Sequence, residues 1–205
     1  MNISPRKTPR QKRSQAMVEI ILEAAARVLA AESLAGFNTN RVAEVAGVSI
    51  GSLYQYFPNK SSLVSALIDY AQTELSESFE KLVANIVGAS ENTLLQSLHD
   101  LAKLSIAQQY SNPTLAAALD HEEARLPVQN QLKASQKRLL ESVAGLFKHH
   151  QKELATDLPE SCLRDCFTIT KSLVEMEAGV SVNPPADLEK RIVRALMGYL
   201  TFQEI

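Results

Sequence analysis

Apolar residues recur every three or four positions along most of this chain, which is the period of an amphipathic α-helix. The first such stretch runs from about residue 15 to 33 and ends in a turn at 34–37, with Phe37 as an expected core residue. Another runs from about residue 60 to 87, behind Asn59 as a candidate cap. This helix is long enough to leave the front of the chain and enter the remainder, so it is a candidate mechanical link between the two.

The same period continues to the end of the chain. We expect further helices over residues 93–110, 114–125, 128–152, 159–180 and 187–202, with Pro113, Pro127 and the Pro184–Pro185 pair at breaks. No stretch shows the alternation typical of a strand. Together with two short helices described next, the pattern predicts an all-α fold of about nine helices.

Residues 39–60, TNRVAEVAGVSIGSLYQYFPNK, contain two short helical segments joined by a tight turn. Thr39 stands at the expected N-cap of the first segment, and Gly47 should end it, because glycine adopts the left-handed conformation without a Cβ clash. Ser49 is placed to cap the second segment, in which Leu53 and Phe57 share an inward face. This spacing predicts a helix-turn-helix.

The string AGVSIGSLYQYFPNKSSL resembles the DNA-binding segment of the TetR/AcrR family of transcriptional repressors, and the match covers about residues 14 to 70. The rest of the chain matches only in general pattern. The resemblance implies a helix-turn-helix domain over residues 15–62 and a larger effector-binding and dimerisation domain over residues 63–205. The matching residues are Gly47, Val48, Ser49, Gly51, Leu53, Tyr54, Tyr56, Phe57, Lys60 and Leu63.

Charge is unevenly distributed along the chain. The net charge is −2, but the first 60 residues hold eight Lys and Arg against four Glu, so the acidic excess lies in the remainder. A basic front suits a polyanionic partner such as DNA. Residues 1–14 carry five basic and no acidic side chains. We read them as a basic flexible tail, which is either solvated or follows DNA phosphates or the minor groove.

Binding to double-stranded DNA combines phosphate contacts, which position the protein, with base contacts, which read the sequence. Thr39 and Lys60 each lie at a helix start, where free N–H groups favour an anion. By the resemblance, the matching Thr, Tyr and Lys positions contact the DNA backbone, although core packing is the alternative for the tyrosines. The phosphate candidates are Thr39, Ser49, Tyr54, Tyr56 and Lys60.

The first turns of the second short helix are expected to read bases, as in other helix-turn-helix proteins. Ile50 suits a thymine methyl group, Gln55 can pair with adenine, and Gly51 permits close backbone approach. The segment carries no Lys or Arg. The base-contact candidates are Asn40, Arg41, Ile50, Gly51, Ser52 and Gln55.

A single unit makes few contacts, so we expect a homodimer on a pseudo-palindromic operator. By the resemblance, the last two helices form the dimer surface as a four-helix bundle. The interface candidates are Leu173, Val174, Ile192, Leu196, Tyr199 and Leu200. An intramolecular core is the alternative for each of them.

The resemblance also implies a small-molecule effector, unidentified from the sequence, held among the central helices. Its binding would shift the long helix that starts at Lys60 and release the DNA. The candidate lining residues are Leu101, Ser105, Tyr110, His121, Glu123, Phe147 and Phe167. Each also has an ordinary explanation as core or solvated surface.

Other chemistry is poorly supported. A zinc site built from His149, His150, Cys162 and Cys166 lacks ligand spacing, and the two cysteines lack a nearby positive charge for a redox switch. We expect no metal, cofactor or enzymatic activity, and neither a signal peptide nor a membrane span. Two cysteines four apart seldom form a bridge on a helix, and the lack of a disulfide framework fits a reducing cytoplasm. The alternatives to a repressor are an activator of the same family and a helical small-molecule-binding or partner-binding protein without sequence-specific DNA binding.

Overall fold

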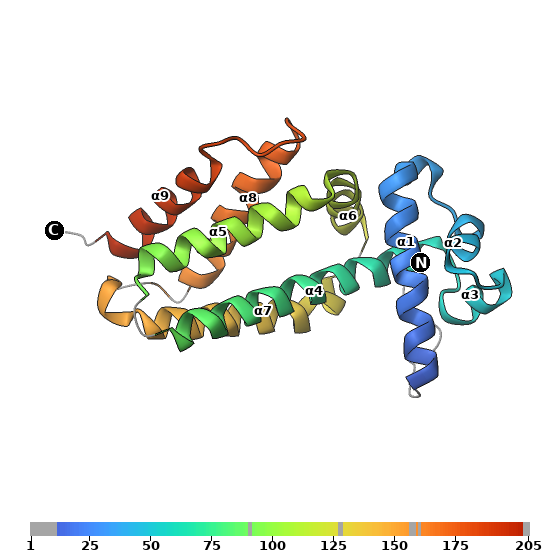
Figure 1. Ribbon diagram of the computed structural model, residues 1–205, viewed down its shortest axis with the longest axis horizontal. Helices are drawn as coiled ribbons and strands as arrows, with labels where there is room; N and C mark the ends of the chain where they lie inside the picture. The colour runs from blue at the N-terminus through green and yellow to red at the C-terminus, as the bar shows by residue number, and fades with distance from the viewer. Residues whose placement is uncertain (1–11, 90–91, 127–128, 156–158, 160, 203–205) are drawn as a thin grey trace. The chain divides into compact units, whose positions relative to one another are not determined.

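The computed structural model describes residues 12–89, 92–126, 129–155, 159 and 161–202, and these residues form nine α-helices and one short 3-10 turn without any strand (Figure 1). The predicted all-α fold is therefore confirmed. The helices are α1 (Lys12–Gly36), α2 (Thr39–Ala46), α3 (Ile50–Tyr56), α4 (Lys60–Gly88), α5 (Leu94–Ser111), α6 (Pro113–Arg125), α7 (Gln129–His149), α8 (Cys162–Ala178) and α9 (Leu188–Thr201), with the 3-10 turn η1 at Gln151–Glu153. Residues 1–11 of the predicted basic tail lie outside the described residues.

The helix ends follow local capping chemistry. Thr93 caps α5 in a capping box, in which its side chain accepts the N–H of Gln96 while the Gln96 side chain accepts that of Thr93. The predicted helix over 128–152 ends at His149 instead, because the chain tightens there into η1. Helix α1 extends past its predicted end but contains a break at Ser33, whose φ of 54° and ψ of −177° are not helical.

The contacts divide the chain into two compact units, Met1–Thr73 with Thr114–Lys133, and Glu74–Pro113 with Ala134–Ile205. Helix α4 contributes residues to both units. The predicted boundary after residue 62 separates a DNA-binding part from an effector-binding and dimerisation part, and this division of function stays a prediction. The core of the first unit joins α1, α2, α3, the start of α4 and α6; its largest fully buried side chains are Ile21, Leu29, Phe37, Leu53, Phe57, Leu63, Leu67 and Ile68.

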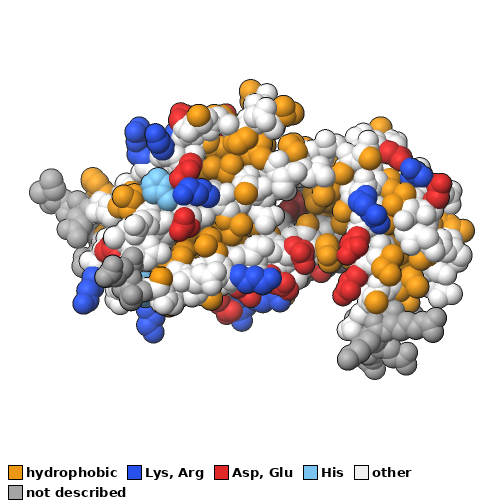
Figure 2. All heavy atoms as spheres, in the orientation of Figure 1, with side chains coloured by type: hydrophobic (Ala, Val, Ile, Leu, Met, Phe, Trp, Pro, Cys, Tyr) orange, Lys and Arg blue, Asp and Glu red, His pale blue; other side chains and the backbone are white. Residues whose placement is uncertain are grey.

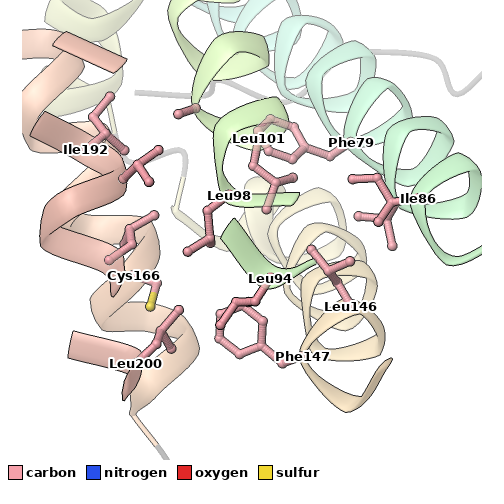
Figure 3. Packing of buried hydrophobic residues seen from close by; sticks show 14 of the residues in the cluster. Phe79, Ile86, Leu94, Leu98, Leu101, Leu146, Phe147, Cys166, Ile192 and Leu200 are labelled. Atoms are coloured by element: carbon pink, nitrogen blue, oxygen red, sulfur yellow. The ribbon is translucent and has the colours of Figure 1, made fainter. Parts of the chain in front are cut away.

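The core of the second unit is organised around α5. Figure 3 shows its leucines pointing on one side toward α4 and α7 and on the other toward α8 and α9. Helix α7 is also tied to α4 by Ser76, whose hydroxyl donates to the Ser135 carbonyl (3.2 Å). The labelled members of this core are Phe79, Ile86, Leu94, Leu98, Leu101, Leu146, Phe147, Cys166, Ile192 and Leu200.

This core corrects part of the predicted dimer surface. Val174, Ile192, Leu196 and Leu200 are each at most 4% exposed and are members of the core of the second unit. Side chains already covered by their own chain cannot gain burial against a second copy. Of the six interface candidates, only Leu173 and Tyr199 remain partly exposed.

The two cysteines are part of the same core and are free thiols. Burial raises the pKa of both, that of Cys166 to about 12, so the reactive thiolate is disfavoured. In the described parts of the chain, no cluster of three or more His, Cys, Asp or Glu is arranged to hold a metal ion. None of the helices described there combines the length and hydrophobicity that crossing a membrane requires.

Candidate nucleic-acid interface

The turn between α2 and α3 has the geometry that its sequence predicts. Gly47 adopts the left-handed conformation (φ 67°, ψ 28°), and its N–H donates to the carbonyls of Ala43 and Glu44. The N–H of Val48 also donates to the Ala43 carbonyl (3.0 Å), which completes the end of α2. Ser49 caps α3 by accepting the N–H of Ser52 (3.0 Å). Backbone hydrogen bonds therefore end α2 at a residue whose positive φ favours glycine.

The cap of α2 is Asn38 rather than Thr39. The Asn38 side chain accepts the N–H of Arg41 (2.9 Å), and its backbone is extended as an N-cap requires. Thr39 is thus the first helical residue, and it is almost fully buried. Sequence reasoning missed Asn38, although asparagine is as strong a cap as any and directly precedes the helix.

Helix α3 has one buried and one open face. Leu53 is fully buried, and so is Phe57, the residue that ends the helix, as the sequence predicts. On the open face, Ile50 is 37% exposed and Tyr54 40% exposed, and the Gln55 side chain is also exposed. The core therefore holds α3 by one side and leaves these side chains free for a partner.

Thr39 and Tyr54, two of the predicted phosphate contacts, lie together. The Thr39 and Tyr54 hydroxyl oxygens are 3.0 Å apart and share a hydrogen bond. This bond links the N-terminus of α2 to the open face of α3. An anion at this point would meet two hydroxyl groups beside the free N–H groups of a helix start, the arrangement that suits a phosphate oxygen.

Lys60 lies in the first turn of α4 and is exposed. Its ammonium group donates to the Leu34 carbonyl (3.3 Å) and lies 5.4 Å from the centre of the Phe37 ring. Asn59 caps this helix as predicted, because its side chain accepts the N–H of Ser62 (2.8 Å). Tyr56 is half-buried against the core of the first unit and is the least available of the predicted phosphate contacts.

Arg41, a predicted base contact, is held between two carboxylates. Its Nε lies 2.8 Å from Glu32 Oε1 and its Nη1 lies 2.7 Å from Glu44 Oε2. The hydrogen bonds with Glu32 and Glu44 raise the pKa of Arg41. Over the first unit, the face seen in Figure 2 shows basic and acidic side chains interspersed rather than one unbroken basic surface. Glu32 was not among the predicted residues, because it lies nine positions earlier on α1.

The seven effector candidates do not form one cluster. Leu101 and Phe147 are buried core residues of the second unit, Phe167 packs against that core, and Ser105 donates its hydroxyl to the Leu101 carbonyl (2.9 Å). Tyr110 also packs against that core.

The other two candidates, His121 and Glu123, belong to α6 in the first unit. The His121 side chain is exposed, and the Glu123 carboxylate accepts the side-chain N–H of Gln72 (3.3 Å). Only the five candidates of the preceding paragraph therefore belong to the second unit.

Two family profiles match the chain. The profile described as "Bacterial regulatory proteins, tetR family" matches residues 21–67, which include α2, the turn and α3. The profile "Tetracyclin repressor-like, C-terminal domain" matches residues 93–200.

Individual proteins are similar to the chain in sequence or in fold. The nucleoid occlusion factor SlmA of Vibrio vulnificus (strain YJ016) is 26% identical over 148 residues, which cover 72% of this chain and 69% of that protein. The crystal structure of a TetR transcription regulator from Haloarcula marismortui has a TM-score of 0.70 at 18% identity, covering 91% of this chain and 97% of the other. The structure of the fatty acid degradation regulator FadR from Bacillus halodurans has a TM-score of 0.70 at 18% identity and covers 89% of this chain and 98% of the other.

Helices α2 and α3 are joined by a tight turn at Gly47, and α3 is anchored to the core on one face and open on the other. This arrangement is that of a helix-turn-helix DNA-binding protein. The chain belongs to the TetR family of bacterial regulatory proteins. It is therefore a transcriptional regulator with a DNA-binding domain and not an enzyme.

Proposed function

We propose that this protein is a dimeric transcriptional repressor that binds a pseudo-palindromic operator and is released from it by a small-molecule effector. The observation that carries the proposal is the open face of α3, where Ile50, Tyr54 and Gln55 are exposed on a helix anchored from behind by Leu53. The likeness to a nucleoid occlusion factor also points to chromosomal DNA as the partner. A regulator of that DNA works in the bacterial cytoplasm.

In this proposal the hydroxyls of Thr39, Ser49, Tyr54 and the half-buried Tyr56, with the ammonium group of Lys60, position the protein on phosphates. Base readout falls to Ile50, Gly51, Ser52 and Gln55, with Asn40 beside them, because all of these except the half-buried Ser52 are exposed. Arg41 uses Nε and Nη1 for its two carboxylates, so a base contact would fall to its Nη2 group. Readout by apolar and amide groups favours A·T-rich half-sites.

The dimer surface that we propose lies on the outer side of α8. Leu173 is half-buried, and three and seven positions further along lie Met176, 58% exposed, and Val180, 85% exposed. Leu173 and Met176 share one face of α8, so apolar surface leads outward from the core, and Val180 adds exposed apolar surface two residues past the end of the helix. Besides Leu173, Tyr199 of α9 is the one predicted interface residue whose side chain is partly exposed. A second copy that covers this apolar surface would place two α3 helices on one DNA.

The division between positioning and reading is tested with two substitutions in the first unit. Lys60→Ala should weaken binding to operator and random DNA by similar factors and lower the slope of log affinity against log salt by about one. Gln55→Ala should cost about 1 to 3 kcal/mol on the operator alone. Fluorescence anisotropy with DNA from upstream of the gene, at three salt concentrations, measures both.

Lys81→Ala is the matched control, because it removes one exposed lysine from the part of α4 that belongs to the second unit. It should leave both affinities unchanged. Equal losses on operator and random DNA for Lys60→Ala and Gln55→Ala alike would overturn the division. Failure of the wild-type protein to prefer any DNA would favour the alternative, a helical binding protein without sequence-specific DNA recognition.

A further inference from the structure

The hydroxyl group of Tyr110 is buried and has no hydrogen-bond partner. Among the described residues, it is the one buried side-chain nitrogen or oxygen atom that lacks such a partner. Tyr110 lies near the end of α5, and its ring packs against the core of the second unit. An unsatisfied buried hydroxyl is unfavourable, so native proteins nearly always give such a group a partner. An exception calls for an explanation, such as an ordered water, an ion or a functional role.

Other tyrosine hydroxyls of this chain illustrate the rule. Tyr199 donates to the Asp165 carboxylate (2.5 Å), and Tyr54 shares its hydrogen bond with Thr39. Phenylalanine would fill the space of Tyr110 equally well without an unpaired polar atom. The hydroxyl of Tyr110 is therefore unexplained by packing.

The charges around Tyr110 determine what kind of group it can bind. Burial, and next the negative charge of Glu177, raise the pKa of Tyr110, so the phenol keeps its proton and remains a donor. Glu177 is itself paired with Arg191, whose Nη1 lies 2.5 Å from Glu177 Oε1. The Glu177 carboxylate thus already holds one partner, and the phenol O–H of Tyr110 makes no hydrogen bond with it. A charged ligand of either sign would lose its hydration against an apolar core, and the charges of Glu177 and Arg191 are already paired with each other.

We infer that Tyr110 is the polar anchor of a ligand site in the second unit and donates its O–H to the acceptor atom of a neutral, mainly apolar small molecule. Ile106, one turn earlier on α5, packs against the same core and supplies apolar surface on the helix face that carries Tyr110. This inference rests on the proposed function, because it gives the effector a chemical class. Neutral ketones, esters and amides with a hydrocarbon body belong to that class.

The test uses two matched pairs of probes, acetophenone with ethylbenzene and 1-indanone with indane. In each pair a carbonyl replaces a methylene group in an almost unchanged skeleton. Titration calorimetry on the DNA-free full chain should show that each ketone binds about 3- to 10-fold more tightly than its hydrocarbon, the value of one hydrogen bond. Tyr110→Phe should abolish this preference and leave the hydrocarbon affinities unchanged.

Tyr199→Phe is the control, because it deletes a tyrosine hydroxyl of the same unit that does have a partner. It should keep the ketone preference and lower the melting temperature, whereas Tyr110→Phe should melt at the wild-type temperature or above. Retention of the preference in Tyr110→Phe, absence of any preference in the wild type, or a loss of melting temperature in Tyr110→Phe equal to that of Tyr199→Phe would each overturn the site.

A further experiment distinguishes failure of the ligand site from failure of the proposed repressor function. The same ketones are added to the complex of the protein with DNA from upstream of the gene. If they bind through Tyr110 but leave DNA affinity unchanged, the site stands and release by a small molecule does not. If another class of compound releases the DNA without any dependence on Tyr110, the repressor proposal stands and the site is refuted.

Discussion

Leu53→Ala should destabilise the first unit by about 2 to 5 kcal/mol and abolish DNA binding with it. Leu53 is fully buried, and its side chain anchors α3 to the core that α1, α2 and the start of α4 form. Removing it leaves a cavity under a helix of only seven residues, which has little stability of its own. The loss should appear as a lower-temperature unfolding transition in calorimetry and as a loss of operator binding at 25 °C.

Ile50→Ala is the matched control for this change, since it truncates an aliphatic side chain on the open face of the same helix. It should alter stability by less than about 0.5 kcal/mol while changing the preferred DNA sequence. If Ile50→Ala destabilised the protein as much as Leu53→Ala, the orientation of α3 described above would be incorrect. Melting curves of the two variants, recorded side by side without DNA, decide the point.

His150→Ala should cost roughly 2 to 4 kcal/mol, because it breaks a buried hydrogen-bond network in the second unit. The two ring nitrogens of His150 bond to Ser97 Oγ (2.9 Å) and Glu153 Oε1 (2.8 Å). The Glu153 carboxylate in turn accepts the N–H of Leu94 at the start of α5 (3.0 Å). Without the imidazole, the buried Ser97 hydroxyl loses its side-chain partner and the carboxylate that caps α5 loses its support.

The neighbouring His149 provides the control, because its side chain is exposed while its ring contacts that of His150 edge-on. His149→Ala should lower the melting temperature by no more than about 2 °C, against roughly 5 to 15 °C for His150→Ala. Melting temperatures by circular dichroism at neutral pH measure both. Similar small shifts for the two variants would show that the network contributes little to stability.

The sequence predicted those features of the fold that depend on neighbouring residues. Gly47 and Ser49 specify a turn by themselves, one through its freedom at positive φ and the other through its cap, and both predictions are confirmed. The four-residue spacing of Leu53 and Phe57 likewise determines which face of α3 is buried. The cap of α2 was assigned one residue too late, because Asn38 and Thr39 are adjacent and both are good cap residues.

Features that depend on distant residues could not be predicted in the same way. An apolar stripe shows that a helix face is covered, but it does not show whether the same chain or a second copy covers it. Ile192 and Leu196 therefore looked suitable for a dimer surface and are core residues. The pairing of Arg41 with Glu32 joins two helices and leaves no signal in the spacing of either. The unpaired hydroxyl of Tyr110 is visible only once its surroundings are known.

The most direct test of the central claim is a selection of bound sequences from a random DNA library, carried out with the wild-type protein and with Gln55→Ala. If α3 of each of two copies enters the major groove, the wild type should enrich an inverted repeat. Its half-sites should lie about one helical turn or a multiple of it apart, and Gln55→Ala should shift the preference at one position of each half-site. Enrichment of no sequence, or of the same sequence by both proteins, would contradict the claim that this face of α3 reads DNA.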